Sequence, residues 1–249
     1  MRKFFVDKNQ IKNNIIEIIN EDVNHIKNVL RLEIDTLIQI SDGEKNYISK
    51  ISKIEKDIVI CEIVEEIENK NEANVKIDIF QGLPKSDKME YIIQKCTELG
   101  VNEYFPVSMK RSIVKLLGKD EQKKIERWQK IVEGAAKQSG RDIVPKVNNI
   151  KNVNNVCEII KNYDIFIVTY ELEEKESLKA ILVNLNKKIE SKIAVLIGPE
   201  GGIEEDEIEL LKKNGAKVVS LGKRILRTET VALAVSSIIM YEYGELGGN

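Results

Sequence analysis

The amino-acid sequence predicts an α/β protein in two parts, a small β-rich domain over residues 1–70 and a larger domain over residues 75–249. Two observations predict this division. Short apolar runs dominate the first 70 residues, whereas beyond residue 74 apolar strands alternate with amphipathic helices. Such alternation is typical of a mostly parallel sheet that is covered by helices on both faces.

The first part is predicted to be rich in strands. They are expected at 4–6, 15–19, 36–41, 45–54 and 58–64. One helix is predicted over 22–32, and the Asp42-Gly43 pair predicts a hairpin turn between two strands. Residues 65–74 are polar and contain no long apolar run, so we expect a linker there.

The second part is predicted from its alternating periodicity. Strands are expected at 75–80, 103–107, 165–169, 193–197 and 218–221, and helices at 85–99, 120–139, 153–161, 178–185, 204–213 and 229–243. The last helix is apolar on nearly all sides, from Val231 to Met240. We therefore expect it to be buried in the domain core or against a second subunit.

Bulk composition narrows the class of protein. The chain is 42% hydrophobic and 32% charged, which is typical of a globular protein. No apolar stretch approaches the roughly 18 residues that span a bilayer, and the start does not resemble a secretory signal. Three widely spaced cysteines indicate reduced thiols, and a single histidine excludes a multi-histidine metal site. We expect a cytoplasmic protein without membrane or metal.

Charge is distributed unevenly along the chain. The net charge is −2, yet residues 108–151 contain twelve basic and five acidic side chains. Phosphates sense charge within a Debye length of about 10 Å, so an RNA would respond to this local excess. A solvated helix face is the alternative that charge alone leaves open.

Two glycine-bearing segments lie about twenty residues apart near the C-terminus. They are Ile197–Gly202 and Leu221–Thr230, and each follows a predicted buried strand and leads into a helix. Open parallel sheets bind ligands at the carboxyl ends of their strands. The sequence therefore predicts a pocket where the two segments meet.

The residues of the first segment narrow the choice of ligand. The chain contains neither GxGxxG after a strand nor a GxxxxGK[ST] loop. The next helix opens with Glu204–Glu207, which would repel a phosphate at its N-terminus. S-adenosylmethionine has no phosphate and fits this requirement. The alternative, a plain turn between strand and helix, needs one glycine rather than three.

Together, Ile197–Gly202 and Leu221–Thr230 resemble the signature of the RsmE family of ribosomal RNA methyltransferases, within the SPOUT superfamily. The resemblance extends over essentially the whole chain, with further matches at 1–6, 25–32, 97–101, 126–128 and 135–139. Residues 32–36 depart from the family pattern, which usually has a glycine before the aspartate.

This resemblance implies a PUA-like β-barrel followed by a SPOUT methyltransferase domain with a deep trefoil knot, in a homodimer with cofactor sites beside the interface. It implies S-adenosylmethionine-dependent methylation of N3 of a uridine in small-subunit (16S) ribosomal RNA, within an assembled or assembling subunit. Two alternatives stay open. They are a SPOUT methyltransferase acting on another RNA such as tRNA, and a non-catalytic RNA-binding or ribosome assembly protein.

The resemblance also assigns roles to residues. We expect Glu200 to orient the uracil or accept its N3 proton, and Arg227 to stabilise charge on a uracil carbonyl oxygen. The expected cofactor-binding residues are Thr169, Tyr170, Glu171, Gly198, Gly201, Gly202, Leu221, Gly222, Ile225, Leu226 and Thr230. The expected contacts to RNA phosphates are Arg2, Lys3, Arg31, Arg111, Arg127 and Arg141.

Overall fold

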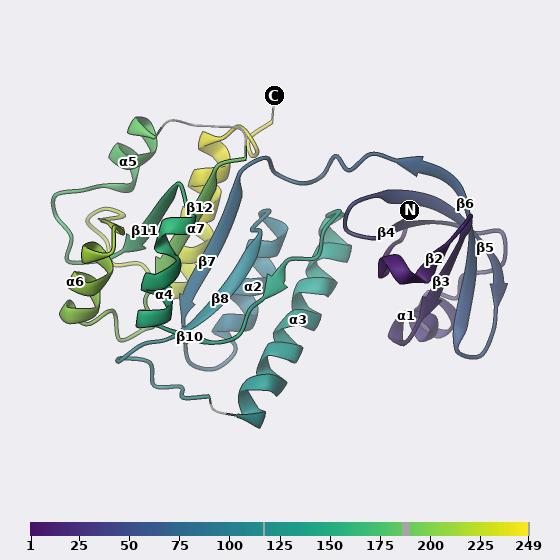
Figure 1. Ribbon diagram of the computed structural model, residues 1–249, viewed down its shortest axis with the longest axis horizontal. Helices are drawn as coiled ribbons and strands as arrows, with labels where there is room; N and C mark the ends of the chain where they lie inside the picture. The colour runs from purple at the N-terminus through teal and green to yellow at the C-terminus, as the bar shows by residue number, and fades with distance from the viewer. Residues whose placement is uncertain (117, 186–189, 249) are drawn as a thin grey trace. The chain divides into compact units, whose positions relative to one another are not determined.

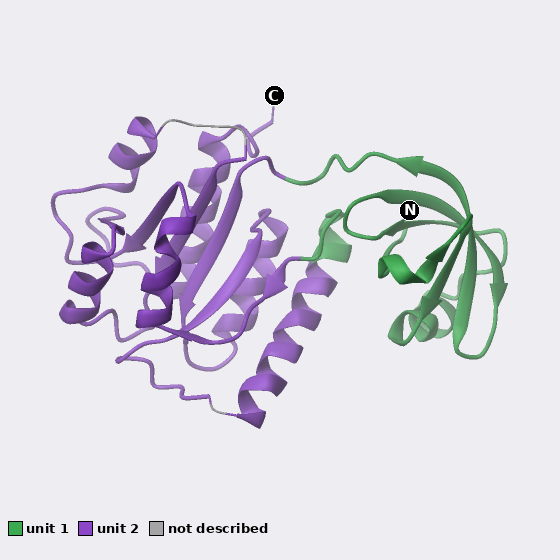
Figure 2. Ribbon diagram, in the orientation of Figure 1, with its two compact units in different colours: residues 1–72, 136–144 green, residues 73–135, 145–249 purple. Residues whose placement is uncertain are grey.

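A computed structural model describes residues 1–116, 118–185 and 190–248, and the chain forms two compact units (Figures 1 and 2). Unit 1 comprises Met1–Glu72 and Ala136–Val144, and unit 2 comprises Ala73–Ala135 and Pro145–Asn249. The chain therefore returns to unit 1 just after its midpoint. The division at 1–70 and 75–249 that the sequence suggests contains no such return.

Unit 1 is built on a curled, mainly antiparallel sheet with the strand order β1-β4-β5-β6-β3-β2. Its strands are β1 (Lys3–Phe5), β2 (Ile11–Lys12), β3 (Ile15–Ile19), β4 (Leu37–Ser41), β5 (Asn46–Ile54) and β6 (Ile58–Ile67). The predicted helix is helix α1 (Glu21–Asn24), which continues into a π-helical turn over His25–Val29. A 3₁₀ turn over Lys8–Gln10 was not predicted.

The core of unit 1 follows from the alternation of its strands. In β3, Ile16 and Ile18 are buried, whereas Ile15 and Ile19 are exposed on the opposite face. The predicted hairpin is confirmed. The Asp42 carboxylate accepts the backbone N–H groups of Glu44 and Lys45 at 2.8 and 2.7 Å.

A buried carboxylate, Asp142, joins the two chain segments of unit 1. It accepts hydrogen bonds from the Lys3 ammonium, from Asn46 Nδ2 at 2.7 Å, and from the N–H groups of Lys70 and Asn71 at 2.9 Å each. Its side chain is fully buried. Donors on three stretches of chain thus share one anion.

The linker predicted over residues 65–74 contains the boundary between the units, which lies between Glu72 and Ala73, but most of its residues belong to unit 1. Strand β6 continues to Ile67, and the next residues are fixed by contacts to Asp142. Glu72 forms an ion pair with Arg141 and accepts the N–H of Asp142 at 2.9 Å. A polar composition does not identify a linker where the polar groups have buried partners.

Lys3 and Arg141, which we expected to bind RNA phosphates, lie in the interior of unit 1. Their side chains are 4% and 6% exposed. Lys3 pairs with Asp142, and Arg141 binds Glu72 through Nε at 3.2 Å and Nη2 at 2.5 Å. Both cations are engaged by carboxylates of the same unit, so we remove them from the proposed RNA-binding set.

Unit 2 contains a seven-stranded parallel sheet with the order β10-β8-β7-β12-β11-β13, in which β9 also pairs with β8. Its strands are β7 (Lys76–Gly82), β8 (Glu103–Ser108), β9 (Lys146–Val147), β10 (Lys151–Asn152), β11 (Ile165–Thr169), β12 (Lys192–Ile197) and β13 (Lys217–Val219). The parallel sheet that the sequence predicts is confirmed. Strands β2, β9 and β10 were missed because two residues are too few to show a period.

Helices cover both faces of this sheet. They are α2 (Lys88–Glu98), α3 (Lys119–Ser139), α4 (Val153–Ile159), α5 (Leu178–Asn184), α6 (Glu205–Lys213) and α7 (Thr228–Glu242). α4 and α6 pack on the face that carries Phe80, while α2 and α7 contact each other on the opposite face (Figure 1). In the described ranges, no helix combines the length and apolar character that a membrane span requires.

The strand order brings three loops to one edge of the sheet. β11 pairs with β12 on one side and with β13 on the other, all in parallel. After the edge strand β13, the chain crosses back so that α7 packs against β12 and α2. The segments that follow β11, β12 and β13 therefore begin side by side.

We expect Asp142→Asn to lower the free energy of unfolding by about 3–5 kcal/mol at pH 7, because it leaves the Lys3 ammonium buried without an anion. Burial acts to raise the pKa of Asp142, but hydrogen bonds from Lys3, Asn71 and Asn46 outweigh it and hold the pKa below its ordinary value. Stabilisation from a lowered pKa is lost as the pH falls. Denaturant titrations should therefore show that the difference in free energy of unfolding between the Asp142→Asn protein and the unmodified protein becomes smaller below about pH 4.

The matched control is Asp57→Asn in the same unit. Asp57 is exposed, so this change should alter the free energy of unfolding by less than about 0.5 kcal/mol. Equal stability of the Asp142→Asn protein and the unmodified protein at pH 7 would contradict the role of Asp142.

Candidate functional site

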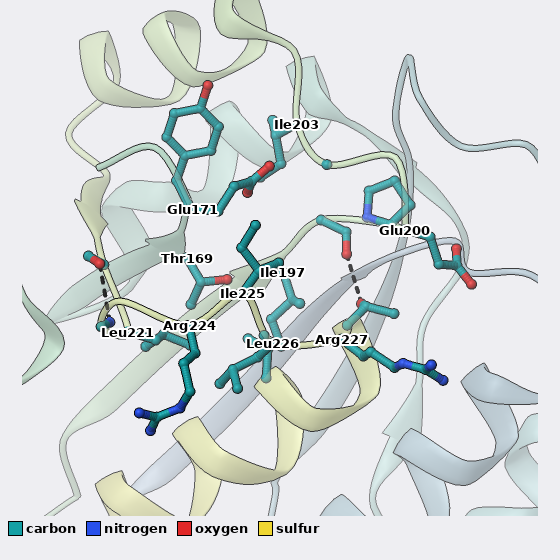
Figure 3. A pocket seen from close by; sticks show the side chains of 18 of the residues that line it. Thr169, Glu171, Ile197, Glu200, Ile203, Leu221, Arg224, Ile225, Leu226 and Arg227 are labelled. Atoms are coloured by element: carbon teal, nitrogen blue, oxygen red, sulfur yellow. Dashed lines mark hydrogen bonds between the residues drawn. The ribbon is translucent and has the colours of Figure 1, made fainter. Parts of the chain in front are cut away.

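A cavity of about 390 Å³ lies where the loops after β11, β12 and β13 meet the start of α7 (Figure 3). Its volume is within the range of small-molecule sites, about 300–1,000 Å³. It is lined by Lys88, Thr169, Tyr170, Glu171, Ile197, Gly198, Pro199, Glu200, Gly202, Ile203, Ser220, Leu221, Gly222, Lys223, Arg224, Ile225, Leu226, Arg227, Thr228 and Val231. All of these residues belong to unit 2.

Two glycines in the loop after β12 lie so close to neighbouring side chains that a Cβ atom would not fit. A Cβ on Gly198 would lie 2.8 Å from Ile203 Cγ1. Gly202 has a φ of +74°, and a Cβ there would lie 2.8 Å from Glu171 Oε1. These glycines let the loop fold tightly against the loop after β11, and the closeness of the two loops defines one wall of the cavity.

A buried hydrogen-bond chain fixes the same loop to β7 and α7. The Thr228 hydroxyl donates to the Gly198 carbonyl oxygen at 2.8 Å and accepts from Gln81 Nε2 at 2.9 Å. Arg227 occupies the N-cap position in an extended conformation, and Thr228 is the first helical residue. Its hydroxyl therefore stabilises the cavity wall.

Glu200 lies at the edge of the cavity, and helix α2 and the turn before it hold its carboxylate. The Lys85 N–H donates to both carboxylate oxygens, at 3.1 and 3.2 Å, and Lys88 Nζ lies 3.0 Å from Oε1. Burial acts to raise the pKa of Glu200, but its own N–H, Lys88 and the Lys85 N–H outweigh burial and lower the pKa. A lower pKa makes a weaker proton acceptor, so this environment favours the orienting role.

Arg111 clamps the loop after β12 from the segment that follows β8. Its Nε and Nη2 donate to the Glu204 carboxylate at 2.8 and 3.1 Å, and Nη1 donates to the Gly201 carbonyl oxygen at 3.1 Å. A Cβ on Gly201 would lie 3.0 Å from Arg111 Cβ. We expected Gly201 to bind the cofactor, but it faces Arg111. We expected Arg111 to bind RNA, but in this structure it holds the loop after β12.

The N-terminal turn of α6 is occupied by side chains of the protein itself. Arg111 binds Glu204, the Lys110 ammonium binds Asp206, and the Lys110 N–H donates to Glu207 at 3.0 Å. The first turn of α6 therefore has cationic partners already. These ion pairs offset the negative charge of Glu204 and Asp206, so the repulsion of phosphate that the sequence suggests is weaker at this helix N-terminus.

The cavity brings together most of the site residues expected from the sequence. Both expected catalytic residues and nine of the eleven expected cofactor-binding residues line it. Gly201 does not, and neither does Thr230, which is exposed on α7. Thr230 follows Thr228 by two residues, so the helix turns it about 200° away from the cavity.

Several lining residues were missed by sequence reasoning. Thr228 itself, the first residue of α7, is one of them, and Val231 lines the cavity three residues later on the same helical face. Lys88 lies on α2, more than a hundred residues before the loop that it contacts, and no local pattern reveals such a contact.

The lining chemistry fits S-adenosylmethionine. Glu171 provides a carboxylate for its cationic groups, and Ile197, Leu226 and Val231 provide apolar surface for its adenine. Backbone at the glycine positions can approach the ligand closely. Among the residues that the structure describes, no group of three His, Cys, Asp or Glu side chains is placed to hold a metal.

The remaining expected RNA contacts are exposed. Arg2 and Arg31 lie on the surface of unit 1. Arg127 lies on α3 in unit 2, where its exposed guanidinium pairs with Glu90 at 2.7 Å. An exposed ion pair of this kind contributes little stability, so an RNA phosphate could compete for Arg127.

Comparison with known proteins identifies similar chains over the full length. The sequence matches the RNA methyltransferase domain family over residues 71–240 and the RNA methyltransferase PUA domain family over residues 18–64. It is 37% identical to ribosomal RNA small subunit methyltransferase E of Bacillus subtilis (strain 168), with 100% of both chains covered. The corresponding protein of Mesomycoplasma hyopneumoniae (strain 232) is 34% identical, with 94% of this chain and 96% of that protein covered.

A solved structure agrees with these sequence matches. The crystal structure of a ribosomal RNA small subunit methyltransferase E from Neisseria gonorrhoeae, bound to S-adenosyl methionine, superimposes with a TM-score of 0.85. It is 30% identical to this chain, and the match covers 97% of both chains.

We expect Thr228→Val to lower the free energy of unfolding by about 1–3 kcal/mol, because it removes one of the two acceptors of the buried Gln81 amide and the donor to the Gly198 carbonyl oxygen. The wall of the cavity should loosen, and the affinity for S-adenosylmethionine should fall about tenfold or more. Denaturant titration and calorimetry measure the two effects.

Thr230→Val is the matched control, since Thr230 is exposed two residues further along the same helix. It should leave both quantities close to those of the unmodified protein. If Thr228→Val behaves like this control, the hydrogen-bond chain does not maintain the cavity.

Proposed function

Because this chain belongs to the RsmE family of ribosomal RNA small subunit methyltransferases, we propose that it methylates N3 of a uridine in small-subunit (16S) ribosomal RNA, with S-adenosylmethionine as methyl donor. The cavity at the carboxyl ends of β11, β12 and β13 is the observation that carries this proposal. It combines a site for the donor with two charged side chains, Glu200 and Arg227, at one edge.

We propose that three loops hold the cofactor. Thr169–Glu171 form one wall, Gly198 and Gly202 form a second, and Leu221–Leu226 form the third. Thr228, in place of Thr230, supports this cradle through Gly198. When bound, S-adenosylmethionine supplies an electrophilic methyl group on a sulfonium centre.

The roles of the two charged residues follow from their surroundings. Glu200 is held as an anion, so it accepts a hydrogen bond from the uracil N3–H and orients the base. Arg227 is exposed at the N-cap of α7, and its guanidinium stabilises the negative charge that develops on a uracil carbonyl oxygen when the N3 proton passes to solvent water. Figure 3 shows both side chains on the same side of the cavity.

We propose that RNA phosphates are bound by the exposed arginines of both units, Arg2 and Arg31 in unit 1 and Arg127 in unit 2. The match of residues 18–64 to an RNA methyltransferase PUA domain supports an RNA-binding role for the first part of the chain, over residues 1–70. The substrate is the RNA of an assembled or assembling small subunit, in the cytoplasm.

We also propose a trefoil knot in the methyltransferase domain, over residues 75–249, and a homodimer. The return of the chain from β13 to pack α7 against β12 supports the knot. An apolar strip on α7 supports the dimer: Ile238 and Tyr241 are 43% and 66% exposed within one chain, although most of the helix is buried. Exposed apolar strips of this kind are typical of subunit interfaces.

The methyl-transfer reaction is tested with purified protein, S-adenosylmethionine and small ribosomal subunits, and N3-methyluridine is measured by mass spectrometry of the digested RNA. Glu200→Gln should lower kcat about 10²-fold or more because the base loses its anionic partner, while cofactor affinity stays within about twofold. Undiminished turnover of Glu200→Gln would contradict its role.

Parallel reactions with tRNA and with free ribosomal RNA separate the alternative functions. Methylated tRNA would indicate a different substrate. Cofactor binding without methylation of any RNA would indicate a non-catalytic protein.

The dimer is tested by Ile238→Lys, which places a charge in the apolar strip of α7. The dimer dissociation constant measured by sedimentation equilibrium should rise at least about tenfold, since a buried unpaired charge opposes association. The control is Val183→Lys on α5, where an exposed apolar residue lies outside the strip. Equal dissociation constants for the two variants would place the interface elsewhere.

A further inference from the structure

Lys88 is the first residue of α2 and lines two adjoining hollows of unit 2. One is the cofactor cavity. The other is a shallow groove that Tyr91 and Gln94 also line. The Lys88 side chain is half-buried, so water only partly screens the charge of its ammonium group.

The Lys88 ammonium lies between two carboxylates. Its Nζ is 3.0 Å from Glu200 Oε1 and 3.5 Å from Glu229 Oε2. Glu229 lies in the first turn of α7, so Lys88 contacts both the loop after β12 and the helix that closes the cavity. Within the described part of the chain, Glu200 forms its ion pair with Lys88 and not with Arg227. The Arg227 guanidinium is therefore available to bind the substrate.

The two oxygens of the Glu200 carboxylate have different partners. Oε1 is bound by both the Lys88 ammonium and the Lys85 N–H, whereas Oε2 accepts the Lys85 N–H at 3.2 Å. A carboxylate can accept about four hydrogen bonds. Oε2 therefore keeps acceptor capacity, and the contacts at Oε1 fix its direction.

We propose that Lys88 is a positioning residue for methyl transfer, which fixes Glu200 as an oriented anion at the edge of the cofactor cavity. This inference rests on the proposed function, because Glu200 acts there on the uracil. Lys88 acts through Glu200: its ammonium occupies Oε1, and Oε2 is left to accept the N3–H of the base. The lowered pKa of Glu200 is consistent with this arrangement.

The kinetic test is Lys88→Met, which keeps the length of the side chain and removes its charge. We expect kcat to fall about tenfold or more, because Glu200 is no longer held in the direction that orients the uracil. KM for S-adenosylmethionine should stay within about twofold, because Glu200 does not bind the cofactor. Lys88→Arg should recover part of the activity. Lys95→Met on the same helix, where Lys95 pairs with Glu98 at 2.8 Å, is the control and should leave kcat unchanged.

A titration that needs no RNA gives an independent readout. Proteins labelled with ¹³C at the glutamate carboxyl carbons are titrated by NMR, and Glu200 is assigned by the signal that Glu200→Gln removes. The charged groups facing Glu200 are Lys88 from α2, with Glu229 and Arg227 from the start of α7. Lys88→Met should raise the pKa of Glu200, because it removes a hydrogen bond and a charge that stabilise the anion.

These readouts distinguish a failure of this inference from a failure of the proposed function. A Lys88→Met protein with unchanged kcat, or with an unmoved Glu200 pKa, overturns the role of Lys88. A wild-type protein that forms no N3-methyluridine overturns the function, even where the pKa of Glu200 shifts as expected. Should Lys88→Met melt well below the wild type, Lys88→Gln is measured in its place, under the same criteria.

Discussion

The parallel pairing of β11 with strands on both of its sides is the constraint on which the site depends. Its register aligns Thr169 with Ile197 of β12 and with Val219 of β13. Three strands therefore end at one level, and each continues into a loop at the same edge of the sheet. A shift of one residue in either pairing would move a loop by about 3.3 Å and turn its side chains to the opposite face.

Helix α7 converts this edge into an enclosed site. Its first residue, Thr228, links the loop after β12 to β7, and its packing on α2 brings Glu229 to Lys88. The cofactor cradle and the anchoring of Glu200 thus share one helix start. Stability and chemistry are coupled there, because the contacts that close the cavity also place the charged groups at its edge.

The sequence predicted those parts of the protein that have a local signal. The strand over 165–169 follows from an apolar run, and the loops after 197 and 221 follow from apolar runs that end in glycine. The buried roles of Lys3 and Arg141 could not be predicted, since their carboxylate partners lie 139 and 69 residues away in the chain. Gly201 does not line the cavity for a related reason: its close neighbour is Arg111, and a glycine motif does not say which side the ligand occupies.

The return of residues 136–144 to unit 1 has a consequence for biosynthesis. When the first 72 residues leave the ribosome, the Lys3 ammonium, the Asn46 amide and the N–H groups of Lys70 and Asn71 still lack their common acceptor. That acceptor is translated some seventy residues later, after the whole of α3. The N-terminal sheet therefore cannot complete its buried contacts when its own strands have been made. The Lys3 ammonium gains its anion only when more than half of the polypeptide has been synthesised.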